Sequence, residues 1–186
     1  MRPFRLEGKP ARLSHFYPAT VLVVGVSSAG RINFMPVVWH SALSFEPPLF
    51  GVWISPKRFT HEMLQSAPSF SVSMHPQEQW RQIHAIGTTS GRRVCKVKEL
   101  GLSFRRGGEL DVPILQGAYA AYELEKQSQI KTGDHDLFVG RLRALWEDES
   151  AFAGEALDPK TVSPLLYFGK YLYGRPCAQT MRPSEV

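Results

Sequence analysis

The sequence predicts a single, mainly β domain in which antiparallel strands close into a barrel, with short helices at its periphery. Many short segments have the composition of strands, and only two segments have a helical pattern. No repeat, low-complexity segment or linker divides residues 1–186, so we expect one domain. Many short strands with few helices are typical of an antiparallel barrel. The strand–Gly-x-Gly-x-x-Gly–helix unit of a Rossmann domain does not occur in the sequence.

The first predicted element is a β-hairpin. Residues 20–26 and 31–38 are predicted strands, joined by a tight turn at Ser28-Ala29-Gly30. The apolar start of this region faintly resembles a secretory signal, but it is short and leads directly into the second strand, which favours the hairpin. A third strand, 49–54, follows Glu46-Pro47-Pro48, where the two prolines stiffen the chain.

Two helices are predicted on either side of a fourth strand. The first covers residues 61–66, with Thr60 as its N-cap and with Phe59 and Leu64 placed for a hydrophobic staple. Pro68 ends this helix, and residues 70–74 then alternate as a strand. The second helix covers residues 76–86, with Pro76 in its first turn.

The C-terminal half is predicted to be largely β-structure. Two long strands, 117–130 and 135–147, form a second hairpin, and a short strand lies near residues 165–168. His135 then lies at the mouth of this hairpin, where strand ends present side chains to a binding site.

The composition favours a cytoplasmic protein with an anionic small-molecule ligand. The formal net charge is +5, but the basic residues are scattered, so a nucleic-acid partner is weakly supported and an anionic ligand explains the excess equally well. The two cysteines, Cys95 and Cys177, are far apart and form no Cys-x-x-Cys pair, which suits a reducing compartment. No run approaches the ~20 apolar residues that a membrane helix needs.

Three segments carry groups suited to a flat, anionic ligand. Residues 33–48 offer a stiff backbone edge that can match the amide-like edge of a heterocycle. Residues 55–60 bring Lys57, Arg58 and the Thr60 hydroxyl to a predicted helix N-terminus, which attracts anions. Residues 88–96 combine hydroxyls, a glycine and three cations, which also suits an anion. Solvated polar loops are the alternative interpretation of the last two segments.

A fourth segment, Gly133–Gly140, places His135 between Asp134 and Asp136. In a strand these acids and the histidine face opposite sides, and no further ligand is evident, so we expect no metal site. The remaining histidines, including His15, His61 and His84, have no partner pattern and are interpreted as structural. Serine hydrolase and zinc protease motifs do not occur in the sequence.

These four segments resemble the flavin reductase-like family, whose members bind FMN on a split β-barrel. The family's Ser-x-x-Pro-Pro element is matched at Ser44, Pro47 and Pro48, and its Arg-x-Thr element is matched at Arg58 and Thr60. Its Ser-Gly-Arg element is matched at residues 90–92, and the lysine that follows this element is matched at Lys96. Its Gly-Asp-His element is matched at residues 133–135. Many relatives carry an acid just before that lysine, whereas this sequence has Cys95 there, which puts a local acid–lysine pair in doubt.

The resemblance implies a six-stranded antiparallel Greek-key split barrel that holds FMN non-covalently, in a homodimer with the flavin near the subunit boundary. It implies NADH or NADPH as electron donor, free flavin or a partner oxygenase as acceptor, and His135 as the residue that positions the nicotinamide. The flavin is expected to be lined by Val37, Val38, Trp39, His40, Ser41 and Ser44. The phosphate is expected to meet Lys57, Arg58, Thr60, Ser90, Gly91, Arg92 and Lys96.

Two alternatives remain open from the sequence. One is a flavoredoxin-like electron carrier, which binds FMN but takes its electrons from another protein. The other is a binding module without a redox role, for which nucleic acid is the candidate ligand and strongly salt-dependent affinity is the expected signature.

Overall fold

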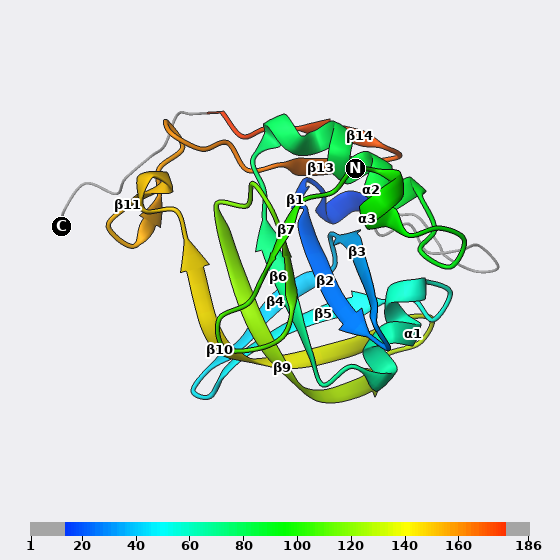
Figure 1. Ribbon diagram of the computed structural model, residues 1–186. Helices are drawn as coiled ribbons and strands as arrows, with labels where there is room; N and C mark the ends of the chain where they lie inside the picture. The colour runs from blue at the N-terminus through cyan, green and yellow to red at the C-terminus, as the bar shows by residue number, and fades with distance from the viewer. Residues whose placement is uncertain (1–13, 178–186) are drawn as a thin grey trace, which may run out of the picture.

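The computed structural model describes residues 14–177, and its centre is a seven-stranded antiparallel sheet. The strand order is β3-β2-β6-β9-β10-β5-β4, so β3 and β4 form the two edges. The sheet curls into a barrel, with α1 at its side (Figure 1). The seven strands are β2 (Leu22–Ser28), β3 (Arg31–Val37), β4 (His40–Phe45), β5 (Pro48–Ile54), β6 (Ser69–Met74), β9 (Ala120–Lys131) and β10 (Asp136–Glu147).

The predicted mainly β barrel is confirmed, but its main sheet has seven strands rather than six. The additional strand is β4, which lies between the predicted strands 31–38 and 49–54 and was not predicted as a strand. Most of its residues are exposed, because β4 is an edge strand that pairs only with β5. An exposed edge strand lacks the apolar alternation by which a strand is recognised in a sequence.

The first hairpin is confirmed, with a turn of two residues. Ser28 pairs with Arg31, and Ala29 and Gly30 between them have φ values of 48° and 71°. Two successive left-handed residues are typical of the tight turns that match the twist of antiparallel strands. The second hairpin is also confirmed, because β9 ends at Lys131, β10 begins at Asp136, and His135 lies in the connection.

Smaller sheets surround the barrel. A three-stranded sheet consists of β1 (Ala19–Thr20), β13 (Leu166–Gly169) and β14 (Leu172–Gly174), and it includes the predicted strand near residues 165–168. Two further pairs are β7 (Phe104–Arg106) with β8 (Pro113–Leu115), and β11 (Phe152–Ala153) with β12 (Ala156–Leu157). The β13–β14 hairpin runs beside α2 at one end of the barrel (Figure 1).

The helices are short, as predicted. They are α1 (Phe59–Ser66), α2 (Trp80–Thr88) and α3 (Lys96–Glu99), together with the single turns η1 (Ser14–Phe16), η2 (Gln77–Gln79) and η3 (Glu149–Ala151). Within residues 14–177, no helix is long and apolar enough to cross a membrane.

The predicted role of Thr60 as the N-cap of α1 was wrong. The cap is Arg58, whose backbone is extended and whose side chain makes no capping hydrogen bond. The helix begins earlier than predicted because Arg58 N donates to Ser55 O and His61 N donates to Arg58 O, so the turn closes before Thr60. Thr60 therefore lies in the first helical turn, where it is buried.

Strand β2 is buried on both faces, and this arrangement positions the helices. Its side chains alternate between two apolar clusters, because successive residues of a strand point to opposite faces. Leu22, Val24 and Val26 lie in one cluster with α1 residues, whereas Val23 lies in the other, together with Val21, which directly precedes β2. The second cluster includes Ile83 and Ile86, which seat α2 against the outside of the sheet next to β3.

Candidate functional site

A cleft of about 500 Å³ lies beside β3, within the size range of small-molecule sites. Its walls come from β3, the end of β5, the start of α1, the end of α2 with the following loop, the β9–β10 connection and the β13–β14 hairpin. These segments are distant in sequence and meet because β3 and β5 lie near opposite edges of one curled sheet. The cleft therefore depends on closure of the barrel.

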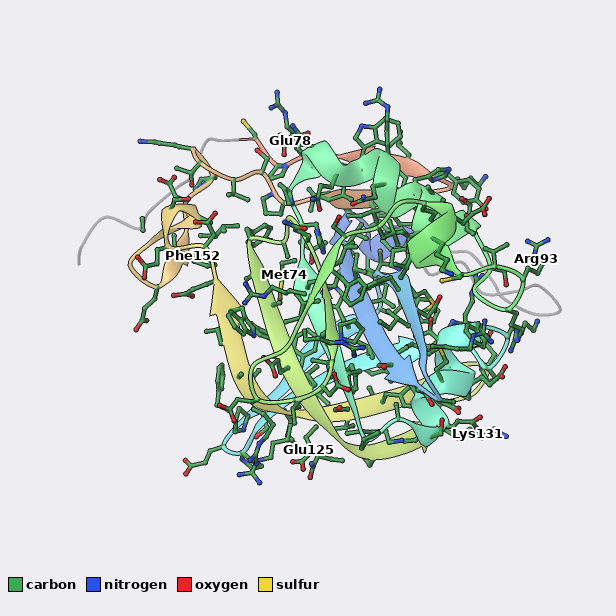
Figure 2. The ribbon with its side chains drawn as sticks, in the orientation of Figure 1. Met74, Glu78, Arg93, Glu125, Lys131 and Phe152 are labelled. Carbon is green, nitrogen blue, oxygen red and sulfur yellow. The ribbon has the colours of Figure 1, made fainter. Side chains whose placement is uncertain are left out.

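One end of the cleft is strongly cationic. Lys57, Arg58, Arg93 and Lys96 line it, and no aspartate or glutamate is among the described lining residues. The N-terminus of α1 adds free backbone N–H groups and the positive end of the helix dipole. Figure 2 shows Arg93 on the loop between α2 and α3. A group of cations at a helix start, with no carboxylate in the described cleft lining, suits an anion such as a phosphate.

Lys96 lies beneath this cationic end. Its ammonium is buried and donates to Phe34 O at 2.8 Å and to Ile86 O at 2.7 Å, so it joins α3 to β3 and α2. Burial, followed by the neighbouring positive charge of Arg58, lowers the pKa of Lys96 to about 8. A bound anion would relieve that repulsion and stabilise the charged form.

The loop after α2 is held against this end by two arginines. Arg31 Nη2 donates to Gly91 O at 2.6 Å, and Arg92 donates to Glu62 Oε2 at 3.1 Å and to Lys57 O at 2.9 Å. A Cβ atom at Gly91 would lie 2.3 Å from Asn33 Oδ1, so only glycine lets the loop approach β3 so closely. Arg92 is thus directed away from the cleft lining, and its neighbour Arg93 lines the cleft instead.

Asn33 is a site residue that sequence reasoning missed. It is 2% exposed, and its Nδ2 donates to Thr60 Oγ1 at 2.8 Å, whereas its Oδ1 has no partner among the described residues. A buried acceptor without a donor is unfavourable, and a ligand O–H or N–H would satisfy it. The sequence feature that could have indicated Asn33 as a site residue is its polar amide within an otherwise largely apolar predicted strand, residues 31–38.

Another part of the cleft lining is aromatic and includes His135. The His135 ring lies 4.5 Å from the Trp39 ring, at 43° to it. Its Nδ1 lies 2.8 Å from Asp134 Oδ1, and this hydrogen bond is the main reason why the pKa of Asp134 is lowered. Because an ionised carboxylate only accepts, Nδ1 donates, which leaves Nε2 available for a hydrogen bond with a ligand.

A tyrosine wall, contributed by the β13–β14 hairpin, also lines the cleft, and it was not among the predicted site residues. The His84 ring lies edge-on to the rings of Tyr171 and Tyr173, at 5.5 and 5.8 Å, and His84 also lines the cleft. The sequence feature that could have indicated this wall is the recurrence of tyrosine at positions 167, 171 and 173. The missed lining side chains of this wall are Tyr17, His84, Tyr167, Tyr171 and Tyr173.

The structure brings most, but not all, of the predicted site residues together. The cleft is lined by Val37, Val38, Trp39, Lys57, Arg58, Thr60, Ser90, Gly91, Lys96 and His135. Arg92 and three residues of β4, namely His40, Ser41 and Ser44, lie outside this lining. His40 stacks on Phe50 and its Nε2 lies 3.0 Å from Thr20 O. A flavin contact by these four residues stays a prediction.

The residues present fit FMN. The cationic end suits the phosphate, the unpartnered Asn33 Oδ1 suits a donor such as a ribityl hydroxyl, and the aromatic end suits a flat ring. Within residues 14–177, no group of three or more His, Cys, Asp or Glu side chains is placed to hold a metal ion.

Comparisons with known proteins agree with this fit. Residues 13–174 match the family model described as "Flavin reductase like domain". An FMN-binding protein from Thermus thermophilus, solved with bound 1-cyclohex-2-enone and with bound p-hydroxybenzaldehyde, is 48% identical to this chain. For the first of these complexes the TM-score is 0.91, and the match covers 98% of this chain and 100% of that chain.

Two curated relatives extend the comparison. An uncharacterized protein from Aeropyrum pernix is 32% identical over 171 residues, which is 91% of this chain but 61% of that protein's length. The chain therefore spans less than two thirds of that relative. An NADH-dependent flavin reductase from Pseudomonas fluorescens is 26% identical over 147 residues, covering 79% of this chain and 76% of the relative.

Proposed function

The chain belongs to the flavin reductase-like domain family, and we propose that its cleft binds FMN and that the protein is an NAD(P)H-dependent flavin reductase. The observation that carries the proposal is the chemistry of the cleft lining. Cations converge on the N-terminus of α1 beside the buried Asn33 amide, and Trp39, His135 and the tyrosine wall supply aromatic rings. These groups suit the phosphate, ribityl chain and ring of FMN.

FMN held by these residues would supply a flavin ring able to take a hydride from a nicotinamide and to pass the electrons on. Hydride transfer needs two rings held close and aligned rather than a strong base. We propose that His135 aligns the nicotinamide, with Nε2 accepting a hydrogen bond from the carboxamide N–H. The name of the Pseudomonas relative supports a nicotinamide donor, and the acceptor we propose is free flavin or a partner oxygenase.

A second candidate concerns small ring carbonyl compounds. The Thermus protein holds 1-cyclohex-2-enone and p-hydroxybenzaldehyde, and it is 48% identical to this chain. We propose that the tyrosine wall accepts such compounds next to the flavin. A concentration-dependent shift of the flavin absorption band on adding either compound is expected, and an unchanged spectrum would contradict this candidate.

The absorption spectrum of the purified protein tests the main proposal. We expect a flavin band, release of FMN rather than FAD on denaturation, and bleaching of the band when NADH or NADPH is added without oxygen. A protein that carries no flavin and binds none on reconstitution would refute the proposal. A bound FMN that dithionite bleaches but neither nicotinamide reduces would favour the flavoredoxin-like carrier instead.

A further inference from the structure

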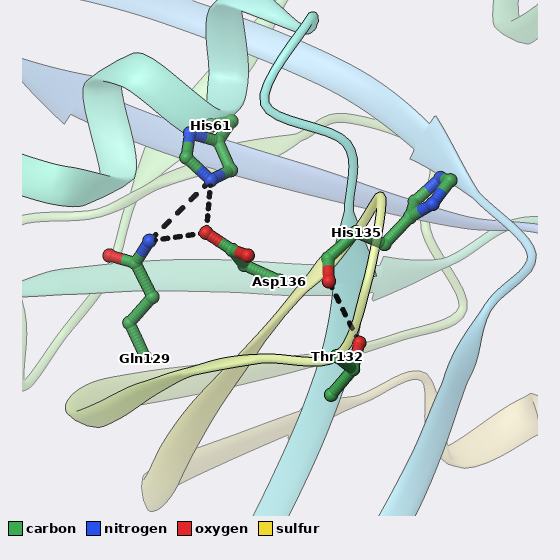
Figure 3. A network of polar contacts seen from close by, with 5 residues as sticks. All are labelled: His61, Gln129, Thr132, His135 and Asp136. Atoms are coloured by element: carbon green, nitrogen blue, oxygen red, sulfur yellow. Dashed lines mark hydrogen bonds and ion pairs between the residues drawn. The ribbon is translucent and has the colours of Figure 1, made fainter.

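A polar network of His61, Gln129 and Asp136 lies next to the cleft, and none of its three side chains lines the cleft. Asp136, the first residue of β10, is 8% exposed, and its Oδ2 lies 2.8 Å from His61 Nε2 and 2.6 Å from Gln129 Nε2. Figure 3 shows Asp136 pointing toward His61 and Gln129, whereas the His135 ring points the other way. His61 also packs edge-on against the buried ring of Phe138, at 5.1 Å.

The network joins three elements through a charged group. His61 comes from α1, Gln129 from β9 and Asp136 from β10. Hydrogen bonds from His61 and then Gln129 lower the pKa of Asp136, which keeps its carboxylate ionised near neutral pH. Hydrogen bonds to an ionised acceptor are stronger than those between neutral groups.

Asp136 also fixes both ends of the cationic loop at residues 55–58. In the sheet register, Asp136 pairs with Ile54, the last residue of β5, immediately before this loop. Its side chain contacts His61. His61 directly follows Thr60 in the first turn of α1, which begins where the loop ends. One residue therefore holds the start of the loop through its backbone and the end through its carboxylate. The same residue directly follows His135.

We propose that Asp136 is a positioning residue that fixes the cationic loop relative to His135, and so pre-organises these two parts of the cleft without touching the ligand. The proposal rests on the function proposed above for its ligand readouts. A loop that is already ordered loses less conformational freedom on binding, so a clamp of this kind raises affinity for the group that the loop contacts. That group is the phosphate, because Lys57 and Arg58 lie on the loop.

The test uses Asp136→Asn, which removes the charge and keeps the shape. Asp148→Asn is the matched control, because Asp148 directly follows the other end of β10, accepts hydrogen bonds from Ser150, and does not line the cleft. We expect Asp136→Asn to weaken FMN binding roughly tenfold, with riboflavin binding nearly unchanged. A general loss of folding stability would weaken both ligands together, so the FMN-to-riboflavin ratio separates positioning from a merely structural role.

A second readout needs no flavin. Hydrogen exchange of the Arg58 and His61 amides, which donate to Ser55 O and Arg58 O, reports the order of the loop directly. We expect exchange at both amides to rise roughly tenfold in Asp136→Asn and to stay unchanged in Asp148→Asn. If Asp136→Asn does not fold, His61→Leu removes the same contact from the α1 side and is expected to behave alike.

The outcomes separate this proposal from the proposed function. A parent protein that binds no flavin refutes the proposed function, while the exchange rates still decide the clamp. The positioning role of Asp136 is overturned if the parent prefers FMN to riboflavin and the variants keep both this preference and the parental exchange rates. Faster exchange and a reduced preference in either variant support it.

Discussion

His135 is the residue on which the proposed reductase activity depends most. Its Nδ1 is occupied by Asp134, its ring leans on Trp39, and its side chain remains 26% exposed at the cleft. A ring fixed on one side with a second nitrogen facing the cleft can align a ligand through a hydrogen bond. The positioning contact to the nicotinamide stays a prediction.

His135→Ala is expected to leave FMN bound and to slow flavin reduction by NADH about tenfold or more, because hydride transfer depends on ring alignment. Stopped-flow measurement at the flavin band gives the rate. Dithionite, which needs no binding site, should reduce parent and variant alike. Equal rates with NADH in both proteins would make His135 only a turn residue.

The sequence could predict those site residues whose chemistry is local. Lys57, Arg58 and Thr60 are found because cations and a hydroxyl beside a helix start are neighbours in the chain. Which of two adjacent arginines enters the cleft is set by the loop backbone, so Arg92 and Arg93 could not be told apart. The unpartnered oxygen of Asn33 becomes visible only when Thr60 and Gly91, both distant in sequence, lie against β3.

Among the elements, α1 was predicted in place but not at its start. Capping preferences favoured Thr60, yet the structure begins the helix after Arg58 without a side-chain cap. The reason is that tertiary contacts fix this turn, since Thr60 accepts from Asn33 and Arg92 donates to Lys57 O. The same applies to β4, whose pairing with β5 alone makes it a strand.

A second buried histidine connects elements at the opposite side of the sheet. His75, which follows β6, is 1% exposed, and its Nε2 lies 2.8 Å from Ser73 Oγ while its Nδ1 contacts Gln79 of η2. Gln79 in turn donates to Gln116 O at 3.2 Å. Burial lowers the pKa of His75 to about 4, so the folded protein keeps this ring neutral.

This pKa predicts how stability depends on pH. The pKa of His75 is 6.5 in the unfolded chain and about 4 in the folded protein, so between these pH values the unfolded chain binds more protons at this position. The contribution of His75 to stability is therefore fully present above pH 6.5 and is lost on acidification toward pH 4. The contribution is up to ~3 kcal/mol. His75→Gln should flatten the dependence of the free energy of unfolding on pH in this window, measured by urea denaturation at several pH values. A parallel dependence in parent and variant would show that His75 is not buried in its neutral form.

At the scale of the whole molecule, the barrel class and its two main hairpins could be predicted from the sequence, because they depend on alternation and on turn residues. The strand order of the sheet and the composition of the cleft could not, because they depend on pairing between distant strands. The tyrosine wall illustrates this: it reaches the cleft through the pairing of β13 with β1 and β14. The resemblance to a family supplied the expected ligand, and the acid-free cationic end gives it a physical basis.

The uncovered edge strand β4 supports the predicted homodimer. Leu43 and Phe45 on this strand are 40% and 96% exposed, and large exposed apolar groups on an edge strand are commonly covered by a partner. Light scattering should give about twice the chain mass of 20.9 kDa. Phe45→Glu should shift the protein toward the monomer. A parent monomer that still holds FMN tightly would refute a site shared between subunits.

The central claim is that the cationic end of the cleft holds the phosphate of FMN, and Arg58→Ala tests it most directly. Arg58 lines the cleft, forms no ion pair with a carboxylate among residues 14–177, and does not cap α1 through its side chain, so the variant should fold normally. Arg106→Ala, which removes an exposed arginine paired with Asp111 outside the cleft, is the matched control.

The measurement is the affinity of each protein for FMN and for riboflavin, which lacks the phosphate. Arg58→Ala should weaken FMN binding by ~1.5–3 kcal/mol, the usual contribution of a hydrogen bond to a charged group, and should leave riboflavin binding nearly unchanged. The Arg106→Ala control should match the parent for both ligands. Equal losses of FMN and riboflavin affinity in Arg58→Ala, or no loss of either, would contradict the claim that this end of the cleft binds the phosphate.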